Sequence, residues 1–275
     1  MLRLLLCISI LAGSQAFFFS RSPDWDKLQV TFGINVFSSG TFSHLPRTVP
    51  AARGEGFTEL SGCGATPMFA GRRFAKNGDL AVVLIFDVNG IIAGIQAGFS
   101  SNQYNGYPDD PIRNHPFVEY DHHQFVTAYF TDPGSICSRG RTSDQYSEEG
   151  TGTRLLIQNG TTPREYITIP MTETGLRTTH WTRGKCFPWM GVHYWYDISR
   201  DMDCGRFFPV FLMYNGGKLN SFGWAFNADL TSPRYEHPPP SQFGRFLNPV
   251  PLCLSGRSRL STLHIYLSNP LRNFC

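Results

Sequence analysis

The sequence predicts an all-β protein, a single disulfide-stapled β-sandwich or jelly-roll-like domain with long loops. Of its 275 residues, 41% are hydrophobic and 14% aromatic, and the formal charge is only +3, which is the composition of a folded globular chain. Only 16% are charged, below the roughly 25% usual in soluble domains, so long helices with many ion pairs are not expected. The apolar runs are short and are separated by glycine and asparagine turn signals, which is typical of strands.

Two β-hairpins are the clearest elements. The apolar run at residues 80–86 is followed by Asn89-Gly90 and a second apolar run, IIAGIQAGF. A similar pair of runs, FFPVFLMY and LNSFGWAF, flanks Asn215-Gly216. Asn-Gly favours a tight hairpin turn because both residues tolerate a positive φ. Since the runs are apolar throughout, we expect both hairpins to be buried in the centre of their sheets.

Weaker patterns complete the expected domain. Further strand candidates are LQVTFGINVF, TRLLIQ, REYITI, WMGVHYWYDI, RLSTLHIYL and FVEYDHHQFVTAYF, the last as one long strand or two shorter ones. No amphipathic helix of ten or more residues is evident, and TVPAARGEG can begin a helix but contains too much glycine to run far. The proline-rich segment 231–251 contains Tyr, Phe and Leu, so we expect an ordered strap over the surface.

Residues 1–16, MLRLLLCISILAGSQA, predict a secretory signal peptide. Arg3 precedes an apolar run, and the small residues Ser14 and Ala16 have the spacing of a cleavage site. The apolar run is shorter than the roughly 20 residues that a membrane span needs. We therefore expect residues 17–275 to form a single secreted, extracellular β domain without a membrane span.

The cysteines agree with an oxidising compartment. Cys7 would leave with the signal peptide, and an even number remains, which predicts three disulfide bonds. The pairing stays open, although Cys186 and Cys204 are close enough in sequence to bridge. The six are Cys63, Cys137, Cys186, Cys204, Cys253 and Cys275. Asn159-Gly160-Thr161 is a glycosylation sequon after an expected strand, so Asn159 is a predicted glycosylation site of a glycoprotein.

Several function classes lack their sequence signature. The basic residues are scattered, with Arg72-Arg73 and Arg257/Arg259 the only close pairs, so no nucleic-acid partner is expected. The chain has neither a GxSxG nucleophile elbow nor an HExxH metalloprotease helix. Gly150-Thr151-Gly152 lacks the third glycine of a phosphate-binding loop.

Histidines offer one candidate site. A neutral imidazole binds copper or zinc, and a nearby carboxylate can orient it. The candidate metal ligands are His122, His123, His180, His193 and His237. Adjacent histidines also begin an apolar strand in copper monooxygenases, but Gln124 stands where those enzymes have methionine. The competing interpretation is that these imidazoles are exposed or hydrogen-bonded among tyrosines.

Aromatic and acidic residues offer two further candidates. Trp189, Trp195, Tyr196 and Asp197 form a candidate binding set, in which the rings would stack on a sugar face. A carboxylate pair for glycoside hydrolysis could come from Asp197 with Asp201, or from Glu119 with Asp121. Calcium at these aspartates is less favoured than copper or zinc at the histidines. The alternative is that the rings form the core and the aspartates cap a loop.

Several phrases together resemble a family of secreted invertebrate proteins described as developmentally regulated gland proteins, best known from molluscs. They are FDVNGIIAGIQ, AYFTDPGSIC, GKCFPWMGVHYW, FLMYNGGKLNSFGW, SPRYEHP and STLHIYL. The resemblance covers the chain from about Phe42 onward. It implies a secreted single domain and transfers no catalytic residue.

Three functions are compatible with these residues. The first is a secreted protein that acts by binding a small molecule, a glycan or a protein partner. The second is a metal-dependent enzyme that uses the histidines, and the third is a carboxylate-pair glycosidase. The sequence leaves open whether the protein is an enzyme, which ligand it takes and its oligomeric state.

Overall fold

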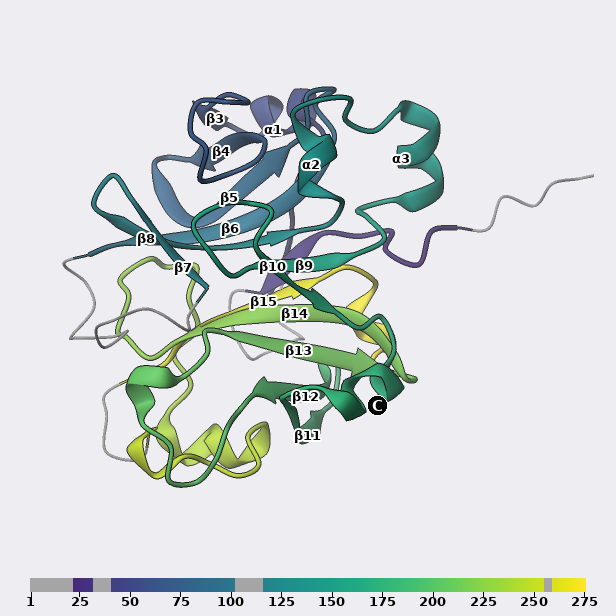
Figure 1. Ribbon diagram of the computed structural model, residues 1–275. Coiled ribbons are helices and arrows are strands. Elements are labelled where there is room, and N and C mark those ends of the chain that lie inside the picture. The colour runs from purple at the N-terminus through teal and green to yellow at the C-terminus, as the bar shows by residue number, and fades with distance from the viewer. Residues whose placement is uncertain (1–21, 32–40, 102–115, 255–258) are drawn as a thin grey trace, which may run out of the picture.

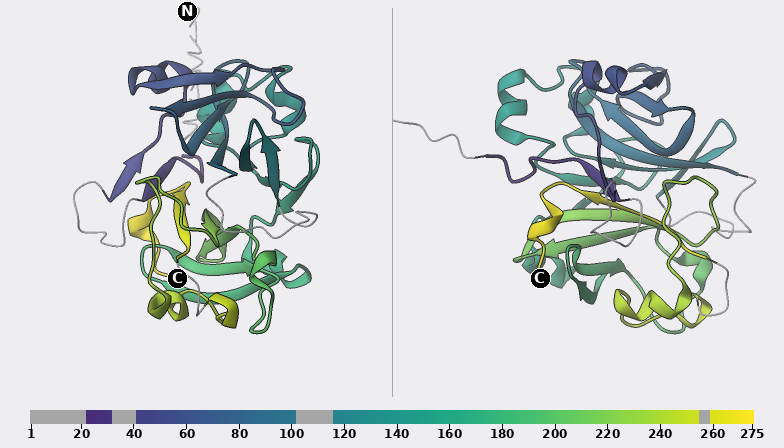
Figure 2. Two further views of the ribbon diagram at one scale, coloured as in Figure 1. Left: turned by 90° about the vertical axis from the view of Figure 1, so that its left-hand side faces the viewer. Right: turned by 180° about the vertical axis from the view of Figure 1, so that it is seen from behind.

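The protein is a sandwich of two antiparallel β-sheets in a computed structural model that describes residues 22–31, 41–101, 116–254 and 259–275. Figure 1 shows the two sheets stacked one above the other, and the views of Figure 2 agree. The predicted signal peptide lies outside the described residues. Among the described helices, none is long and apolar enough to cross a membrane. The all-β sandwich prediction is confirmed.

The seven-stranded sheet has the order β11-β12-β13-β14-β15-β1-β2. Its strands are β1 (Gln29–Thr31), β2 (Phe42–His44), β11 (Trp181–Phe187), β12 (Gly191–Tyr196), β13 (Val210–Asn215), β14 (Lys218–Phe226) and β15 (Ser261–Tyr266). The two N-terminal strands therefore add to a sheet whose other five strands come from the C-terminal part of the chain.

The eight-stranded sheet has the order β10-β9-β8-β6-β5-β4-β3, with β7 paired to β8. Its strands are β3 (Phe57–Ser61), β4 (Arg72–Lys76), β5 (Asp79–Phe86), β6 (Ile92–Ser100), β7 (Phe117–Tyr120), β8 (His123–Tyr129), β9 (Leu155–Gln158) and β10 (Tyr166–Ile169). The α-helices are short: α1 (Val49–Gly54), α2 (Pro133–Ile136) and α3 (Ser143–Glu149). They lie on the far side of this sheet from the seven-stranded one (Figure 1).

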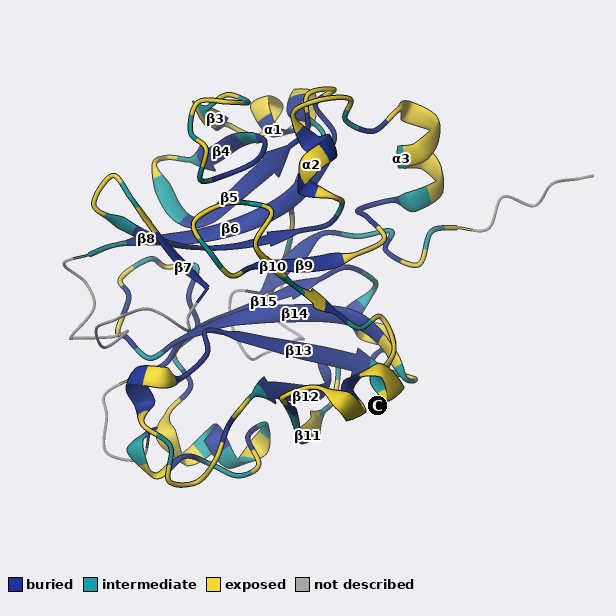
Figure 3. Cartoon of the chain, viewed as in Figure 1, coloured by how far each residue is buried: buried dark blue, intermediate teal, exposed yellow. Residues whose placement is uncertain are grey.

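Both predicted hairpins are confirmed. β5 pairs with β6, and β13 pairs with β14 across Gly216-Gly217, which both have positive φ. These strands are buried along most of their length, as Figure 3 shows in dark blue. The segment FVEYDHHQFVTAYF is two strands, β7 and β8, because Asp121 and His122 adopt the positive φ of a two-residue turn.

Aromatic side chains fill the space between the sheets. Phe99 meets Phe226 at a ring-centroid distance of 5.2 Å, and Phe130 meets Phe222 at 6.2 Å. Because side chains alternate along a strand, the neighbours of these rings point to the outer face of each sheet. We call these surfaces the seven-strand outer face and the eight-strand outer face, and both carry polar residues that loops cover.

Three disulfide bonds are present, as predicted, but the suggested pair was wrong. Cys186 bonds to Cys275 and Cys204 bonds to Cys253, while Cys63 bonds to Cys137. Closeness in sequence was misleading because Cys186 is on β11, at the edge of its sheet, where the C-terminal tail passes it.

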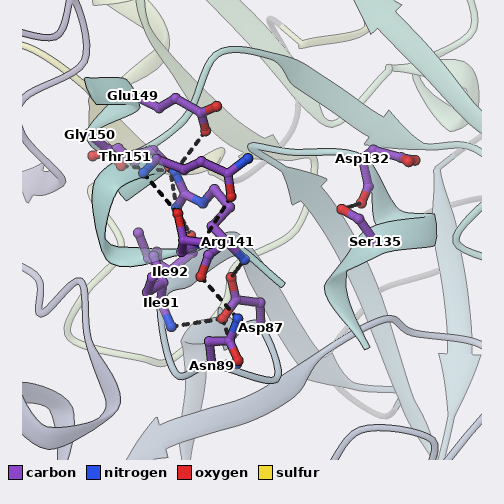
Figure 4. A network of polar contacts seen from close by, with 12 residues as sticks. Asp87, Asn89, Ile91, Ile92, Asp132, Ser135, Arg141, Glu149, Gly150 and Thr151 are labelled. Atoms are coloured by element: carbon purple, nitrogen blue, oxygen red, sulfur yellow. Dashed lines mark hydrogen bonds and ion pairs between the residues drawn. The ribbon is translucent and has the colours of Figure 1, made fainter. Parts of the chain in front are cut away.

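A buried polar network holds the β5–β6 turn to the segment before α3 (Figure 4). Asp87 accepts hydrogen bonds from the backbone N–H groups of Asn89, Ile91 and Arg141. The Arg141 guanidinium donates to the carbonyl oxygens of residues 92, 150 and 151 and pairs with Glu149 at 3.5 Å. The turn DVNG, which resembles a fragment of a calcium loop, is therefore an anchor for this backbone.

Candidate functional site

The seven-strand outer face carries a row of imidazole, hydroxyl and aromatic side chains. Strand register sets this row, because His193 on β12 lies opposite Met213, and His264 on β15 lies opposite Gly223 of β14. Thr262, His264 and Tyr266 alternate with the core residues Leu263 and Ile265. The polar positions of β12 and β15 therefore share one side of the sheet.

The proline-rich segment crosses this row, as expected of a strap. Its backbone is fastened at Phe246, whose carbonyl oxygen accepts from Trp195 Nε1 at 3.1 Å and from the backbone N–H of Lys185 at 3.1 Å. Between strap and sheet is a cavity of about 40 Å³. Its walls are mainly aromatic or apolar and include Phe187, Met190, Trp195, Phe211 and Phe246, joined by His193, Glu236, Gln242, Arg245, Thr262 and His264.

A buried carboxylate and an imidazole form the polar centre of the cavity wall. Glu236 is 7% exposed, and its Oε2 lies 2.9 Å from Nδ1 of His264. Glu236 also accepts from the hydroxyl groups of Thr31 and Thr262. An ionised carboxylate only accepts hydrogen bonds, so it holds the proton of His264 on Nδ1. In the neutral form of His264, Nε2 is then an acceptor, and no hydrogen bond among the described residues uses it.

His193 provides a second imidazole that is neutral. Burial, and then repulsion from His264, lower the pKa of His193 to about 3. Its ring stacks on Phe211 at 5.5 Å and meets the His264 ring at 6.1 Å. His193 therefore contributes an uncharged aromatic wall over the physiological pH range.

A glycine shapes the cavity floor. Gly223 on β14 lies between β13 and β15, and a Cβ built there would be 2.2 Å from the Phe211 ring. The ring of Phe211 can therefore lie across β14 and reach His264, at a centroid distance of 5.0 Å. A larger residue at 223 would displace the ring that packs against both imidazoles.

The structure does not bring the five predicted metal ligands together. His122 and His123 lie at the β7–β8 turn in the other sheet, and His180 is exposed before β11. His193 lines the cavity, whereas His237 contacts the Leu260 carbonyl from the strap. Among the described residues, no group of three or more His, Cys, Asp or Glu side chains is placed to hold a metal ion.

The predicted binding set is also divided. Trp195 lines the cavity, but Tyr196 is the next residue on the strand and points to the opposite face. Tyr196 and Asp197 instead line a cavity of about 430 Å³ at the end of β12, together with Asp201. Trp189 lies in the turn between β11 and β12. Glu119 and Asp121 lie at the β7–β8 hairpin, on the other sheet from this cavity.

The sequence analysis did not select Glu236 or His264 as site residues, although it predicted the strap and the strand that contain them. The signal for His264 was the alternation of polar and apolar residues in STLHIYL, which predicts one polar face on that strand. Glu236 had no such signal, because it lies in a strap and only the isolated bridge to Thr262 brings it onto the sheet.

Comparison of the chain with models of protein families, with curated proteins and with solved structures finds no match.

Proposed function

We propose that this protein is a secreted, extracellular binding protein that takes the apolar end of a small ligand into the cavity beneath the strap. The observation that carries the proposal is the Glu236–His264 pair in the wall of an aromatic cavity. An apolar pocket with few convergent polar groups is the usual form of a small-molecule site. At about 40 Å³ the cavity exceeds the roughly 10–15 Å³ that one water needs, so it takes part of a ligand.

The ligand should carry a hydrogen-bond donor at this end. Glu236 occupies Nδ1 of His264, so the imidazole offers its Nε2 lone pair to the cavity. The walls are mainly aromatic and offer few polar partners, which makes an unpaired polar atom costly and a correct pairing selective. A ring or short aliphatic group with a hydroxyl or N–H group satisfies both the apolar walls and the imidazole.

Phenol and anisole test this pairing, because they share a ring and only phenol has a donor. We expect saturation-transfer NMR to show that the wild-type protein binds phenol about fivefold more tightly, the effect of roughly 1 kcal/mol from one hydrogen bond. His264→Phe should remove the preference, and His180→Gln, an exposed histidine outside the cavity, should keep it. Equal binding of the two probes to the wild type would contradict the proposal.

Secretion is tested separately. Three disulfide bonds support an oxidising compartment, and Asn159 is exposed directly after β9. On expression in a eukaryotic secretory host, we expect the medium to contain a chain that begins at Phe17. Its mass should fall on glycosidase treatment, and Asn159→Gln should abolish that change. Retention inside the cells with an intact N-terminus would argue against export.

We also propose that the protein is related to the secreted invertebrate gland proteins whose sequences it resembles. This relationship is compatible with an extracellular binding role and assigns no reaction.

A further inference from the structure

The eight-strand outer face contains an arginine whose environment is unusual. Arg73 on β4 is 3% exposed, whereas its neighbour Arg72 lies on the other face of the strand, is half-buried and pairs with Glu59 at 2.8 Å. Arg73 lies in the row opposite Ile85, and its Nε donates to Oε1 of Gln96 at 2.9 Å. Gln96 in turn donates to the hydroxyl of Thr127, so the guanidinium has a fixed orientation.

Three aromatic rings surround this guanidinium. Its central carbon lies 4.5 Å from the ring centroid of Phe69, 4.6 Å from that of Phe125 and 5.8 Å from that of Tyr120. A Cβ at Gly98 would be 2.3 Å from the Phe125 ring, so this glycine allows the ring to lie flat beneath the arginine. Met68, Leu80 and Tyr120 pack around the cluster and are only half-buried, which places the guanidinium just below the molecular surface.

Arg73 lacks the partners that the other buried charges have. Arg141, also 3% exposed, pairs with Glu149 and donates to three carbonyl groups. In the described part of the chain, no carboxylate forms an ion pair with Arg73, and neither of its terminal nitrogens has a hydrogen bond. Burial lowers the pKa of Arg73 to about 10, so the group is still a cation at neutral pH.

A buried charge without a countercharge is costly, and cation–π contacts offset only about 2 kcal/mol of this cost. The two terminal nitrogens of a guanidinium present parallel N–H groups that match a carboxylate, phosphate or sulfate. We propose that Arg73 anchors an oxyanion-binding site on the eight-strand outer face, where the rings of Phe69, Phe125 and Tyr120 hold the guanidinium in position. The site lies on the opposite side of the sandwich from the cavity beneath the strap and does not depend on it.

The test measures thermal unfolding of the full secreted chain in low-millimolar acetate, phosphate or sulfate, against chloride at equal ionic strength. We expect an oxyanion to raise Tm by about 2 °C or more, because only the folded state binds it. Arg73→Met keeps the apolar stem and should lose this rise. Arg72→Gln removes an adjacent surface arginine and should retain it. Stabilisation by acetate indicates a carboxylate ligand, whereas a rise limited to phosphate and sulfate indicates a phosphorylated or sulfated one.

If Arg73→Met does not fold, Arg73→Lys replaces it in the test. Lysine keeps the positive charge but lacks the planar guanidinium with its parallel N–H groups. We expect its rise in Tm to be well below that of the wild type. The proposal is overturned if oxyanions do not stabilise the wild type, or if they stabilise a folded Arg73 variant to the same extent. General salt effects on stability would be the same in all variants and would produce that second result.

Discussion

The two outer faces of the sandwich bury side chains of opposite charge, and these two side chains differ in their hydrogen-bond partners. On the seven-strand outer face, Glu236 is surrounded by donors from Thr31, Thr262 and His264. On the eight-strand outer face, Arg73 has one hydrogen bond, to Gln96, and otherwise aromatic rings. Hydrogen bonds from the protein itself stabilise the carboxylate. The terminal N–H groups of the arginine have no such partner within the described ranges and are available to the proposed oxyanion.

The comparison separates two ways of building a binding site. In the first, a charge is fully paired and serves to orient a neighbour, so a ligand in the cavity would meet the imidazole of His264 and not the carboxylate of Glu236. In the second, the charge itself is the proposed binding group. The free-energy cost of burying the Arg73 cation is then offset only when an anion binds. The two faces should therefore respond differently when their charges are removed, and the following experiments measure that difference.

The largest effect is expected from Glu236→Ala. This change leaves the donors of Thr31, Thr262 and His264 without their acceptor in a buried position. Because unpaired buried donors each cost 1 kcal/mol or more, we expect the free energy of unfolding to fall by about 3 kcal/mol. Chemical denaturation measures this loss, and a loss near zero would show that Glu236 does not organise the face.

Each face also has a glycine beneath a phenylalanine, and both should resist enlargement. In Gly223→Ala the new Cβ meets the Phe211 ring and the Leu263 carbonyl, and in Gly98→Ala it meets the Phe125 ring. We expect either change to cost about 1–3 kcal/mol through overpacking. Gly54→Ala, where a Cβ meets nothing within 4 Å, is the control and should be neutral. Tolerance of both changes would mean that the rings have room to move.

His193 makes the stability of the seven-strand outer face depend on pH. The folded pKa is about 3 and the unfolded value about 6.5, so between these values only the unfolded chain takes up the proton. Stability therefore falls as pH falls through this window, by up to about 1.4 kcal/mol per unit. His193→Phe should lose about 1 kcal/mol less than the wild type between pH 6 and pH 5. His122→Gln, at an exposed turn, should behave as the wild type.

Removal of the Arg73 charge should have a smaller effect than removal of Glu236. Arg73→Met in chloride buffer loses a bond to Gln96 but also removes a desolvated cation, so we expect a change within about 1 kcal/mol of the wild type. Arg141→Met is the contrast, since it leaves Glu149 and three carbonyl groups without their donor, and it should lower the free energy of unfolding by about 2 kcal/mol. Chemical denaturation measures both variants. If their free energies of unfolding fall by similar amounts, Arg73 is as well paired as Arg141, which contradicts the prediction.

Chelation should have the smallest effect. The predicted histidine ligands are spread over both sheets and the strap, so we expect dialysis against EDTA to shift Tm by less than about 1 °C. Phenol binding should also survive the treatment. Elemental analysis of the secreted protein checks the same point, and one tightly bound copper or zinc per chain would contradict it.

Local pattern was sufficient for much of the fold. The apolar runs around Asn89-Gly90 and Asn215-Gly216 predicted hairpins that are present, because a tight turn and its two strands are adjacent in sequence. The short helix at TVPAARGEG and the ordered strap followed from the same kind of reasoning. Three disulfide bonds followed from an even number of cysteines, but their pairing did not.

The candidate sites were only partly predictable. His193 and Trp195 were selected, yet their partners His264 and Glu236 were not, since nothing local joins β12 to β15 or to the strap. Arg72 and Arg73 are adjacent in sequence, but alternation along β4 places their side chains on opposite faces. Arg72 pairs with Glu59, whereas Arg73 lies among aromatic rings.

The sequence by itself determined the class of fold, the buried hairpins and the number of disulfide bonds, because each depends on composition or on residues close along the chain. Only the tertiary structure decided which polar residues become buried and which of them meet. Register across β12, β13, β14 and β15 places His193 beside His264, and the path of the strap adds Glu236. These contacts join residues far apart in sequence. They form only when the strands and the strap pack together, so no single segment predicts them.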